Sequence, residues 1–358
     1  MIETWSTKKL GEVCDFVFGY SFRADDFNES GDGLPVIRIG DIDKGITKKF
    51  YYKKYNNKYL VNNGEILIGL SGSIKVNKWK GKRALLNQRI VKVHNFTSGV
   101  SENFVFYQLP KVLKRLEIQI SQGTVKNVLL PHLFNLQILV PSLSIQQKII
   151  ERLNEIRKAQ ELNEKQISLA NELFQSLLHQ ELKPKKNWQT KKLKEVAAIH
   201  YGKGLTRSER KENGKIFAYG SNGPVYKTDK ILINSPTIVI GRKGAVGAVH
   251  LVETPCWPID TTFYTEILDS NLIDLKFLYF ALRIKKLEKM AIVTAVPGIN
   301  RDHLYNITLC IPSIIIQHQI VKKLSIIQEY KKKLLKQKEL LQELFEKVLH
   351  KCFSGENL

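Results

Sequence analysis

The sequence predicts an α+β fold: two pseudo-repeated, mixed α/β globular domains held apart by two long helices in an antiparallel coiled coil. One phrase occurs twice, since residues 5–13 read WSTKKLGEV and residues 188–196 read WQTKKLKEV. Another also occurs twice, as HLFNLQILVPSLSIQ at 132–146 and HLYNITLCIPSIIIQ at 303–317. A long helical pattern follows each copy of the second phrase. A repeat of this length defines the architecture before any single motif is weighed.

The two halves share a frame but differ inside it. The first phrase repeats at an offset of 183 residues and the second at 171, so the second half is 12 residues shorter between the phrases. We therefore expect two versions of one task. The expected boundaries are a first globular domain at 1–141, a central helical spacer at 142–182, a second globular domain at 183–312 and a distal helical spacer at 313–358.

The globular domains have the pattern of compact mixed folds. Short β-branched runs that end near glycine predict strands at 34–40, 65–69 and 237–240. Short helical patterns begin near Asn103 and Leu275, towards the end of each domain. The length of 358 residues allows each domain to bury a core of its own.

The long helices follow from apolar residues at steps of three and four. We expect Ser144 with Gln147 to cap the first helix, Ser313 to cap the second, and Pro184 to stop the first. A helix of about 37 residues is about 55 Å long, so its apolar seam needs a partner, and the other helix is the simplest one. The predicted seam of the pair consists of Ile149, Ile156, Ile167, Phe174, Ile320, Ile327, Leu334, Leu341 and Phe345.

Composition narrows the class of protein. No apolar run approaches the roughly 18–20 residues that a membrane-spanning helix needs, and the first residues lack the pattern of a signal peptide. The cysteines Cys14, Cys256, Cys310 and Cys352 are far apart and form no CxxC pair. We expect free thiols in a reducing, cytoplasmic environment, with neither a disulfide framework nor a metal site.

The net charge of +22 is concentrated in the globular domains. Residues 1–143 carry +9 and residues 183–313 carry +10, whereas residues 144–182 carry −1 and residues 314–358 carry +4. Such a distribution favours a polyanionic partner, and nucleic acid is the leading hypothesis. The alternative is solubility charge in a host whose proteins are rich in lysine, but the balanced first helix argues against this as the whole explanation.

Candidate DNA-binding residues lie where basic side chains occur with aromatic residues or with glycine. Lysine and arginine neutralise phosphates, and glycine lets a loop approach them closely. Each such loop is also compatible with a surface hairpin that carries solvated charges. The candidates are Tyr20, Arg23, Lys48, Lys49, Lys53, Lys54, Lys75, Lys78, Lys80, Arg83, Lys203, Arg207, Tyr219, Ser221, Asn222, Arg242 and Lys243.

Two globular domains on an antiparallel helix pair predict a molecular ruler. A spacing of about 55 Å corresponds to about one and a half turns of B-DNA. Each domain would then read a short sequence, with an unread gap between the two. Because the interiors of the repeats differ, we expect the two half-sites to differ as well.

The chain resembles the specificity subunit of type I restriction–modification enzymes over essentially its whole length. The resemblance depends on the repeated phrases and on NQR at 87–89, YGSNG at 219–223, GRKGAVG at 241–247, DTTF at 260–263, and PSxxxQ at 141–146 and 312–317. It implies two target recognition domains and two helical spacers. It also implies assembly on double-stranded DNA with two methyltransferase subunits, which carry the catalysis, and with ATP-dependent restriction subunits. No catalytic residue, metal or cofactor is implied in this chain.

The sequence lacks the motifs of the partner enzymes. It contains no Asn-Pro-Pro-aromatic or Asp-Pro-Pro-Tyr methyltransferase motif and no GxxxxGK[ST] phosphate loop. This disfavours the first alternative, a fragment of a fused restriction–methylation enzyme. A second alternative is an RNA-binding scaffold with a coiled-coil spacer, which competition between duplex DNA and RNA would distinguish.

Overall fold

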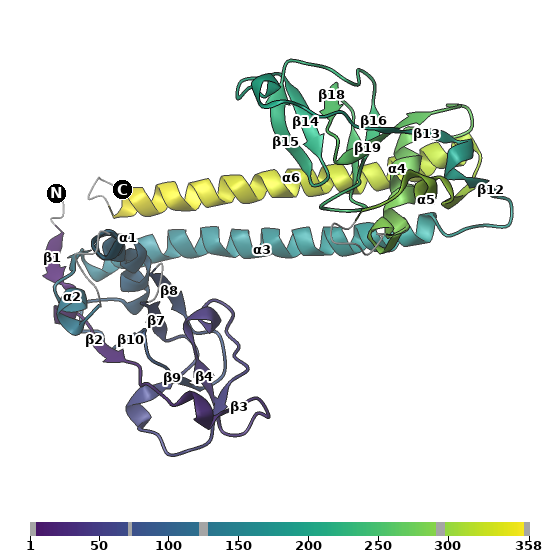
Figure 1. The fold of residues 1–358 in the computed structure, drawn as a ribbon. Coiled ribbons are helices and arrows are strands. Elements are labelled where there is room, and N and C mark those ends of the chain that lie inside the picture. Colours follow the sequence, from purple (N-terminus) through teal and green to yellow (C-terminus); the bar gives the residue numbers. More distant parts are fainter. Residues whose placement is uncertain (1–4, 71–73, 122–127, 291–297, 354–358) are drawn as a thin grey trace. The chain divides into compact units, whose positions relative to one another are not determined.

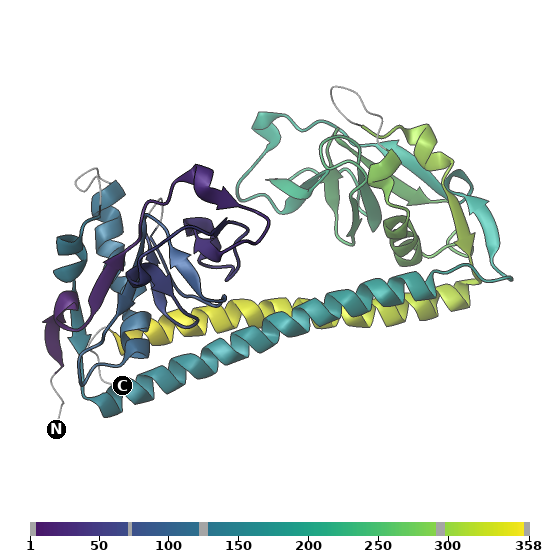
Figure 2. The ribbon, with the colours of Figure 1, turned by 90° about the horizontal axis from the view of Figure 1, so that it is seen from below.

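The computed structural model describes residues 5–70, 74–121, 128–290 and 298–353 and divides into two compact units. Unit 1 comprises residues 1–162 and 338–358, and unit 2 comprises residues 163–337. Each unit combines sheets and short helices with parts of two long helices, α3 (Leu143–Glu181) and α6 (Ile314–Cys352) (Figures 1 and 2). The predicted fold class is confirmed, because both units are α+β and share the strand order of one four-stranded sheet.

Unit 1 is built on a four-stranded antiparallel sheet of order β2-β10-β7-β8 and a second sheet of order β3-β5-β4-β9-β6, while β1 pairs with β11. Its strands are β1 (Ser6–Lys9), β2 (Asp15–Phe18), β3 (Phe27–Asn28), β4 (Leu34–Ile37), β5 (Phe50–Tyr51), β6 (Leu60–Val61), β7 (Ile66–Gly69), β8 (Lys75–Lys78), β9 (Ala84–Leu86), β10 (Ile90–His94) and β11 (Gln137–Val140). Its helices are α1 (Glu102–Ser121) and α2 (Leu130–Phe134), with 3-10 turns at Leu10–Glu12, Ala24–Asp26, Ile39–Asp41 and Asn57–Tyr59.

Unit 2 repeats this arrangement with sheets of order β13-β19-β16-β17 and β15-β14-β18, while β12 pairs with β20. Its strands are β12 (Gln189–Lys192), β13 (Ala197–Tyr201), β14 (Ile216–Gly220), β15 (Gly223–Thr228), β16 (Thr237–Gly241), β17 (Val249–Val252), β18 (Cys256–Pro258), β19 (Thr262–Ile267) and β20 (Thr308–Ile311). Its helices are α4 (Leu275–Ile284) and α5 (Arg301–Tyr305), with 3-10 turns at Leu193–Glu195, Arg207–Glu209 and Leu287–Met290.

The two kinds of sheet differ in how far they are shared between the units. We call β2-β10-β7-β8 and β13-β19-β16-β17 the frame sheets, because their strands correspond one to one. We call β3-β5-β4-β9-β6 and β15-β14-β18 the variable sheets. In the parallel pair of each variable sheet, Val36 lies opposite Leu85 and Ala218 lies opposite Trp257. These partners are 49 residues apart in unit 1 and 39 in unit 2, so most of the 12-residue difference falls in the variable sheet.

A glycine at the end of the first frame strand is required by close packing of the backbone. Gly19 and Gly202 occupy the same place in the repeat, six residues after the repeated phrase that ends at Val13 and at Val196. A Cβ atom at Gly19 would lie 1.9 Å from the carbonyl oxygen of Asn87, and one at Gly202 would lie 2.1 Å from that of Ile259. Only glycine permits this approach in either unit.

Both long helices contribute side chains to the hydrophobic core of each unit. In unit 1, Ile149 and Leu153 of α3 and Cys352 of α6 are buried in the core, and the ring of Phe353, directly after α6, packs against that of Phe104 with centroids 5.3 Å apart. In unit 2, Phe174 of α3 and Leu324 of α6 belong to one core. The ends of the helices are therefore fixed by the same apolar burial that folds each unit.

The contacts between α3 and α6 run antiparallel in each unit. In unit 1, Arg157 lies over the ring of Phe345, and Gln160 Nε2 donates to the carbonyl oxygen of Leu341 over 3.3 Å. In unit 2, Asn163 Nδ2 donates to the carbonyl oxygen of Leu334 over 3.2 Å. Further along α3 in unit 2, Glu181 pairs with Lys323 over 2.7 Å. Rising residue numbers on α3 thus meet falling numbers on α6.

The first long helix begins one residue before the expected cap, Ser144. It starts at Leu143, and the carbonyl oxygen of Ser142 accepts the first helical hydrogen bond from the backbone of Gln146. The prediction that Ser144 caps this helix is therefore wrong, since Ser144 already lies inside the first turn. The second helix starts at Ile314, directly after Ser313 as predicted.

The helices and the cysteines of the described residues agree with the composition. None of the helices in the described ranges is long and apolar enough to cross a membrane. All four cysteines are free thiols, as expected. Burial raises the pKa of Cys14 to about 12 and that of Cys256 to about 11, so these thiols stay protonated at neutral pH.

A buried glutamine at the start of each long helix explains the PSxxxQ motif. Gln146 Nε2 donates to the carbonyl oxygens of Gly99 and Pro141, each over 2.9 Å, and its Oε1 accepts from the backbone of Ser101 over 2.8 Å. Gln317 makes the equivalent three bonds, to Leu272, Pro312 and Asp274. Both glutamines are completely buried. Each side chain therefore satisfies backbone groups of a loop of its domain and of the proline that precedes its helix at once.

We predict that Gln146→Ala and Gln317→Ala each lower the free energy of unfolding by about 2–4 kcal/mol, because buried backbone groups lose their partners. Chemical denaturation of the full chain measures the change. Gln147, an exposed neighbour whose side chain donates to Glu151 on its own helix, is the matched control. Gln147→Ala should change stability by less than about 0.5 kcal/mol. Equal effects at 146 and 147 would contradict the assignment.

Candidate nucleic-acid interface

Unit 1 carries an aromatic pocket on its variable sheet. Phe22 lies at its centre, with ring centroids 5.1 Å from Tyr20 and 4.7 Å from Tyr51. Tyr20 also packs against Tyr59 at 5.3 Å, and Tyr20 is 49% exposed. The pocket has a volume of about 420 Å³ and is lined by Tyr20, Phe22, Tyr51, Lys54, Tyr55, Asn56, Lys58 and Tyr59. Rings with lysines beside them are suited to a base or sugar whose phosphate is neutralised nearby.

The lysines and arginines predicted for DNA contact in unit 1 fall into two groups. Lys49, Lys53, Lys75 and Lys78 pair with Glu29, Asp26, Asp43 and Glu102 over 2.6, 2.5, 2.5 and 2.9 Å. Arg23, Lys48, Lys54, Lys80 and Arg83 are exposed, and the described residues provide no ion pair for them. The second group holds the charge that a polyanion could neutralise without first displacing a carboxylate.

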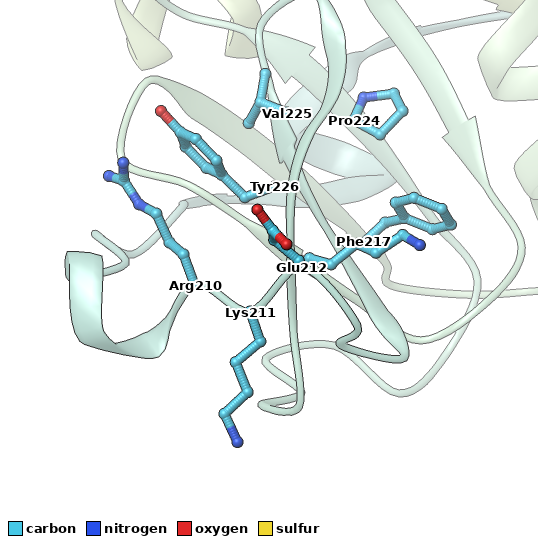
Figure 3. A pocket seen from close by; sticks show the side chains of 8 residues that line it. Arg210, Lys211, Glu212, Phe217, Pro224, Val225 and Tyr226 are labelled. Atoms are coloured by element: carbon cyan, nitrogen blue, oxygen red, sulfur yellow. The ribbon is translucent and has the colours of Figure 1, made fainter.

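Unit 2 carries a pocket of about 440 Å³ on the outer hairpin of its own variable sheet (Figure 3). Phe217 comes from β14, and Pro224, Val225, Tyr226 and Lys227 come from β15. The pocket is completed by Arg210, Lys211 and Glu212 from the loop before β14. The guanidinium carbon of Arg210 lies 3.9 Å from the centroid of Tyr226, so the cation covers the ring.

The apolar members of this pocket are unusually open to solvent. Phe217 is 44% exposed, Val225 is 46% exposed and Tyr226 is 39% exposed. An exposed apolar patch framed by cations is typical of a binding surface. In a major groove such side chains can contact a thymine methyl group, and an arginine can donate to guanine.

An electrostatic clasp holds the loop that carries Arg207 and Arg210. The backbone N–H of Thr206 donates to the Glu209 carboxylate over 2.8 Å, and Lys230, which follows β15 in the chain, donates to the same carboxylate. The Lys230 ammonium, followed by the Thr206 groups, lowers the pKa of Glu209 to about 2. Arg210 is fixed from the other side, because its guanidinium donates to the carbonyl oxygen of Leu205 over 3.1 Å.

The DNA-contact candidates in the glycine-rich loops of unit 2 differ in their exposure to solvent. Lys203 and Asn222 are exposed, Tyr219 is half-buried, and burial raises its pKa. Ser221 is 7% exposed, and its hydroxyl donates to the carbonyl oxygen of Thr261 over 2.7 Å. Since that hydroxyl already has a partner inside the unit, we do not include Ser221 in the candidate interface.

The loop after β16 presents Arg242 and Lys243. Lys243 is exposed, while Arg242 is half-buried and stacks on the ring of Tyr201. Gly244 and Gly247 adopt φ of +78°, a region that favours glycine, so the loop can turn tightly here. Sequence reasoning identified this loop but not Tyr201, which lies forty residues earlier and joins it only through the pairing of β13, β19 and β16.

The predicted seam residues of the long helices are all buried or half-buried. Ile149, Phe174, Ile320 and Leu334 are buried, and Ile156, Ile167, Ile327, Leu341 and Phe345 are half-buried. Asn163 is also buried, at the point where α3 contacts Leu334 of α6, and its Oδ1 has no partner among the described residues. A polar group at such a position fixes the register of a helix pair at some cost in stability.

Sequence comparison identifies the family. The model of the type I restriction modification DNA specificity domain matches residues 2–172 and again residues 185–344. The chain belongs to this family. The two matches coincide with the two halves of the internal repeat, so each half contains one copy of the DNA specificity domain.

Curated relatives agree with the assignment to the DNA specificity family. The chain is 29% identical over 152 residues to the type I restriction enzyme EcoBI specificity subunit of Escherichia coli, a match to 42% of this chain and 32% of that subunit. It is 24% identical over 405 aligned positions to the MjaVIII specificity subunit of Methanocaldococcus jannaschii, across 99% of this chain and 93% of that subunit. The second relative therefore matches at almost full length, whereas the first matches over about a third of its own length.

Solved structures show the same fold. The type I restriction–modification S subunit from M. genitalium superposes with a TM-score of 0.65 at 18% identity, covering 98% of this chain and 96% of that one. A chain from a structure of complex assembly and conformational transition of the type I R-M system superposes with a TM-score of 0.62 at 17% identity, covering 99% and 98%. At this identity the similarity supports the fold of the specificity family and not individual contacts.

We predict that Glu209→Gln lowers the melting temperature of the full chain at pH 7, and that the difference from wild type shrinks at pH 3.5. The pKa of Glu209 is lowered on folding, so its contribution is complete above the ordinary value of 4.5 and is lost as the pH falls towards about 2. Thermal melts at both pH values measure this. Glu212→Gln in the same exposed loop is the control, and a difference independent of pH would contradict the clasp.

Proposed function

We propose that this chain is the non-catalytic, DNA sequence-recognition subunit of a type I restriction–modification complex. The observation that carries the proposal is the division of labour between the sheets. The frame sheets and the glutamine contacts are the same in both units, while the variable sheets differ in length and each carries its own pocket of aromatic and cationic side chains. One scaffold with two different binding surfaces is suited to an asymmetric DNA site of two parts.

In this proposal the chain has four functional segments. Residues 1–141 form the first target recognition domain and residues 183–312 form the second. Residues 142–182 and 313–358 are the helical spacers, which set the unread gap between the half-sites. Support comes from α3 and α6, each of which is a continuous helix of 39 residues with core side chains in both units.

The partners in the proposal are double-stranded DNA, two methyltransferase subunits and ATP-dependent restriction subunits. The relatives named above are specificity subunits of restriction enzymes, and one of the similar structures concerns assembly of the whole system. The long helices carry apolar side chains that neither unit buries, which supports a role in assembly. These exposed side chains include Leu162, Leu169, Leu173, Ile326, Tyr330, Leu340 and Leu344.

Catalysis in the proposed complex belongs to the partner subunits, and the complex is cytoplasmic. The chain lacks the methyltransferase and phosphate-loop motifs. In the proposed function it binds no cofactor. The competing readings, a fused enzyme fragment or an RNA-binding scaffold, gain no support from the family match across both halves.

The test is a domain exchange read out by methylome sequencing. Replacing residues 1–141 with the recognition domain of another specificity subunit should change one half of the methylated motif and leave the other half and the gap unchanged. A host that lacks this gene is the control, and its genome should lose the bipartite motif entirely. A change in both halves, or a motif that persists without the gene, contradicts the proposed function.

A further inference from the structure

Unit 2 contains a pair of arginines stacked on one exposed tyrosine. The guanidinium carbons of Arg242 and Arg301 each lie 5.3 Å from the centroid of the Tyr201 ring. Arg242 comes from the loop after β16, and Arg301 is the first residue of α5. Tyr201 is 49% exposed, so the group formed by these three residues lies at the surface. We call it the paired-arginine site.

Aromatic rings hold both guanidinium groups in place. Arg242 also lies 6.0 Å from the ring of Phe263, and Arg301 lies 5.7 Å from the ring of Tyr305. The Tyr305 hydroxyl is fixed by the backbone N–H of Ile199, 3.1 Å away. Planar stacking orients a guanidinium group while leaving its N–H donors available at the edge.

The two cations have no acidic partner among the described residues. The ion pairs of unit 2 use other side chains, and Arg301 Nε is buried without a hydrogen-bond partner in the described part of the chain. Because each lies 5.3 Å from the same ring centroid, the two guanidinium carbons are at most about 11 Å apart. This separation is comparable to the screening length of about 8 Å at physiological salt. Two like charges placed together without an acidic partner suit an anion with several acceptor oxygens.

The repeat shows that the fold does not require these charges. Strand β19 of unit 2 corresponds to β10 of unit 1. Tyr201 pairs with Phe263 on β19 and Phe18 pairs with Val91 on β10, so Tyr201 occupies the position of Phe18. The same registers place Gly241 at the position of Gly69, so Arg242 corresponds to Leu70. Arg301 begins α5 as Leu130 begins α2. Unit 1 therefore builds the same frame with Phe18, Leu70 and Leu130 at these positions.

We infer that the paired-arginine site is a phosphate clamp that binds a phosphodiester group of the DNA backbone in the half-site of unit 2. The inference rests on the proposed function and adds a contact that is present in one domain and absent from the same place in the other. The site positions the duplex and does not read a base, because both donors are held at the frame and not on the variable sheet. The described pocket at Arg210 is separate from it.

The test uses the full chain co-purified with its methyltransferase subunits and two DNA duplexes, one with the methylated motif and one without it. Arg301→Leu installs the residue that unit 1 carries at the equivalent position, and Arg242→Gln removes the second charge. Each change should weaken binding to both duplexes alike, by roughly 5-fold, and reduce the slope of log affinity against log salt by about 1. The methylated motif should stay the same.

The control is Arg283→Gln, which removes another stacked arginine of unit 2, on α4 over Phe174 and Tyr279. Its salt slope should equal that of the wild type, and thermal melts verify that all variants are folded. An unchanged slope in both site variants, with normal binding by the wild type, overturns the clamp and leaves the proposed function intact. Loss of binding to the specific duplex alone indicates base readout and also overturns it. Failure of the wild-type complex to bind duplex DNA overturns both.

Discussion

Burial of the two long helices in the domain cores is the constraint on which the rest of the structure depends. Ile149 and Leu153 in unit 1, and Phe174 and Leu324 in unit 2, leave water together with the strands of their own unit. Gln146 and Gln317 then tie each helix start to a neighbouring loop through buried hydrogen bonds. A domain cannot release its helix without opening its core, so rotation of a domain about the helix axis is opposed by apolar burial.

The residues that stabilise the fold are largely separate from those proposed to recognise DNA. The frame sheets and the repeated glycines keep the fold, and they tolerate no change where a Cβ atom would strike the backbone, as at Gly19 and Gly202. The variable sheets meet these glycines only where β9 and β18 end, and their parallel strand pairs span about ten residues more in unit 1 than in unit 2. In the proposed function, new DNA sequences can be recognised by altering the variable sheets and single frame positions such as Arg301, without cost to the helix contacts.

The repeat, the antiparallel helices and the strands at 65–69 and 237–240 could be predicted from sequence, because they depend on patterns of residues along the chain. The strand predicted at 34–40 was too long, since β4 ends at Ile37 and a 3-10 turn follows at Ile39–Asp41. The helix cap was misplaced by two residues, since α3 starts directly after Ser142 and not after Ser144. Which cations are free could not be predicted. Lys53 pairs with Asp26 and Ser221 bonds to Thr261, and both pairings arise only when distant segments meet.

In the proposed function, the helix pair sets the distance between two independent half-sites. The most direct test inserts four residues after Asn163 in α3 and four before Leu334 in α6, where these two residues contact each other. An insertion of four is a stutter that a helix pair can absorb by local unwinding, and it lengthens each helix by about 6 Å. Methylome sequencing should then show both half-sites unchanged and the gap longer by about one or two base pairs of ~3.4 Å each. A methylated motif with its original gap would contradict the account.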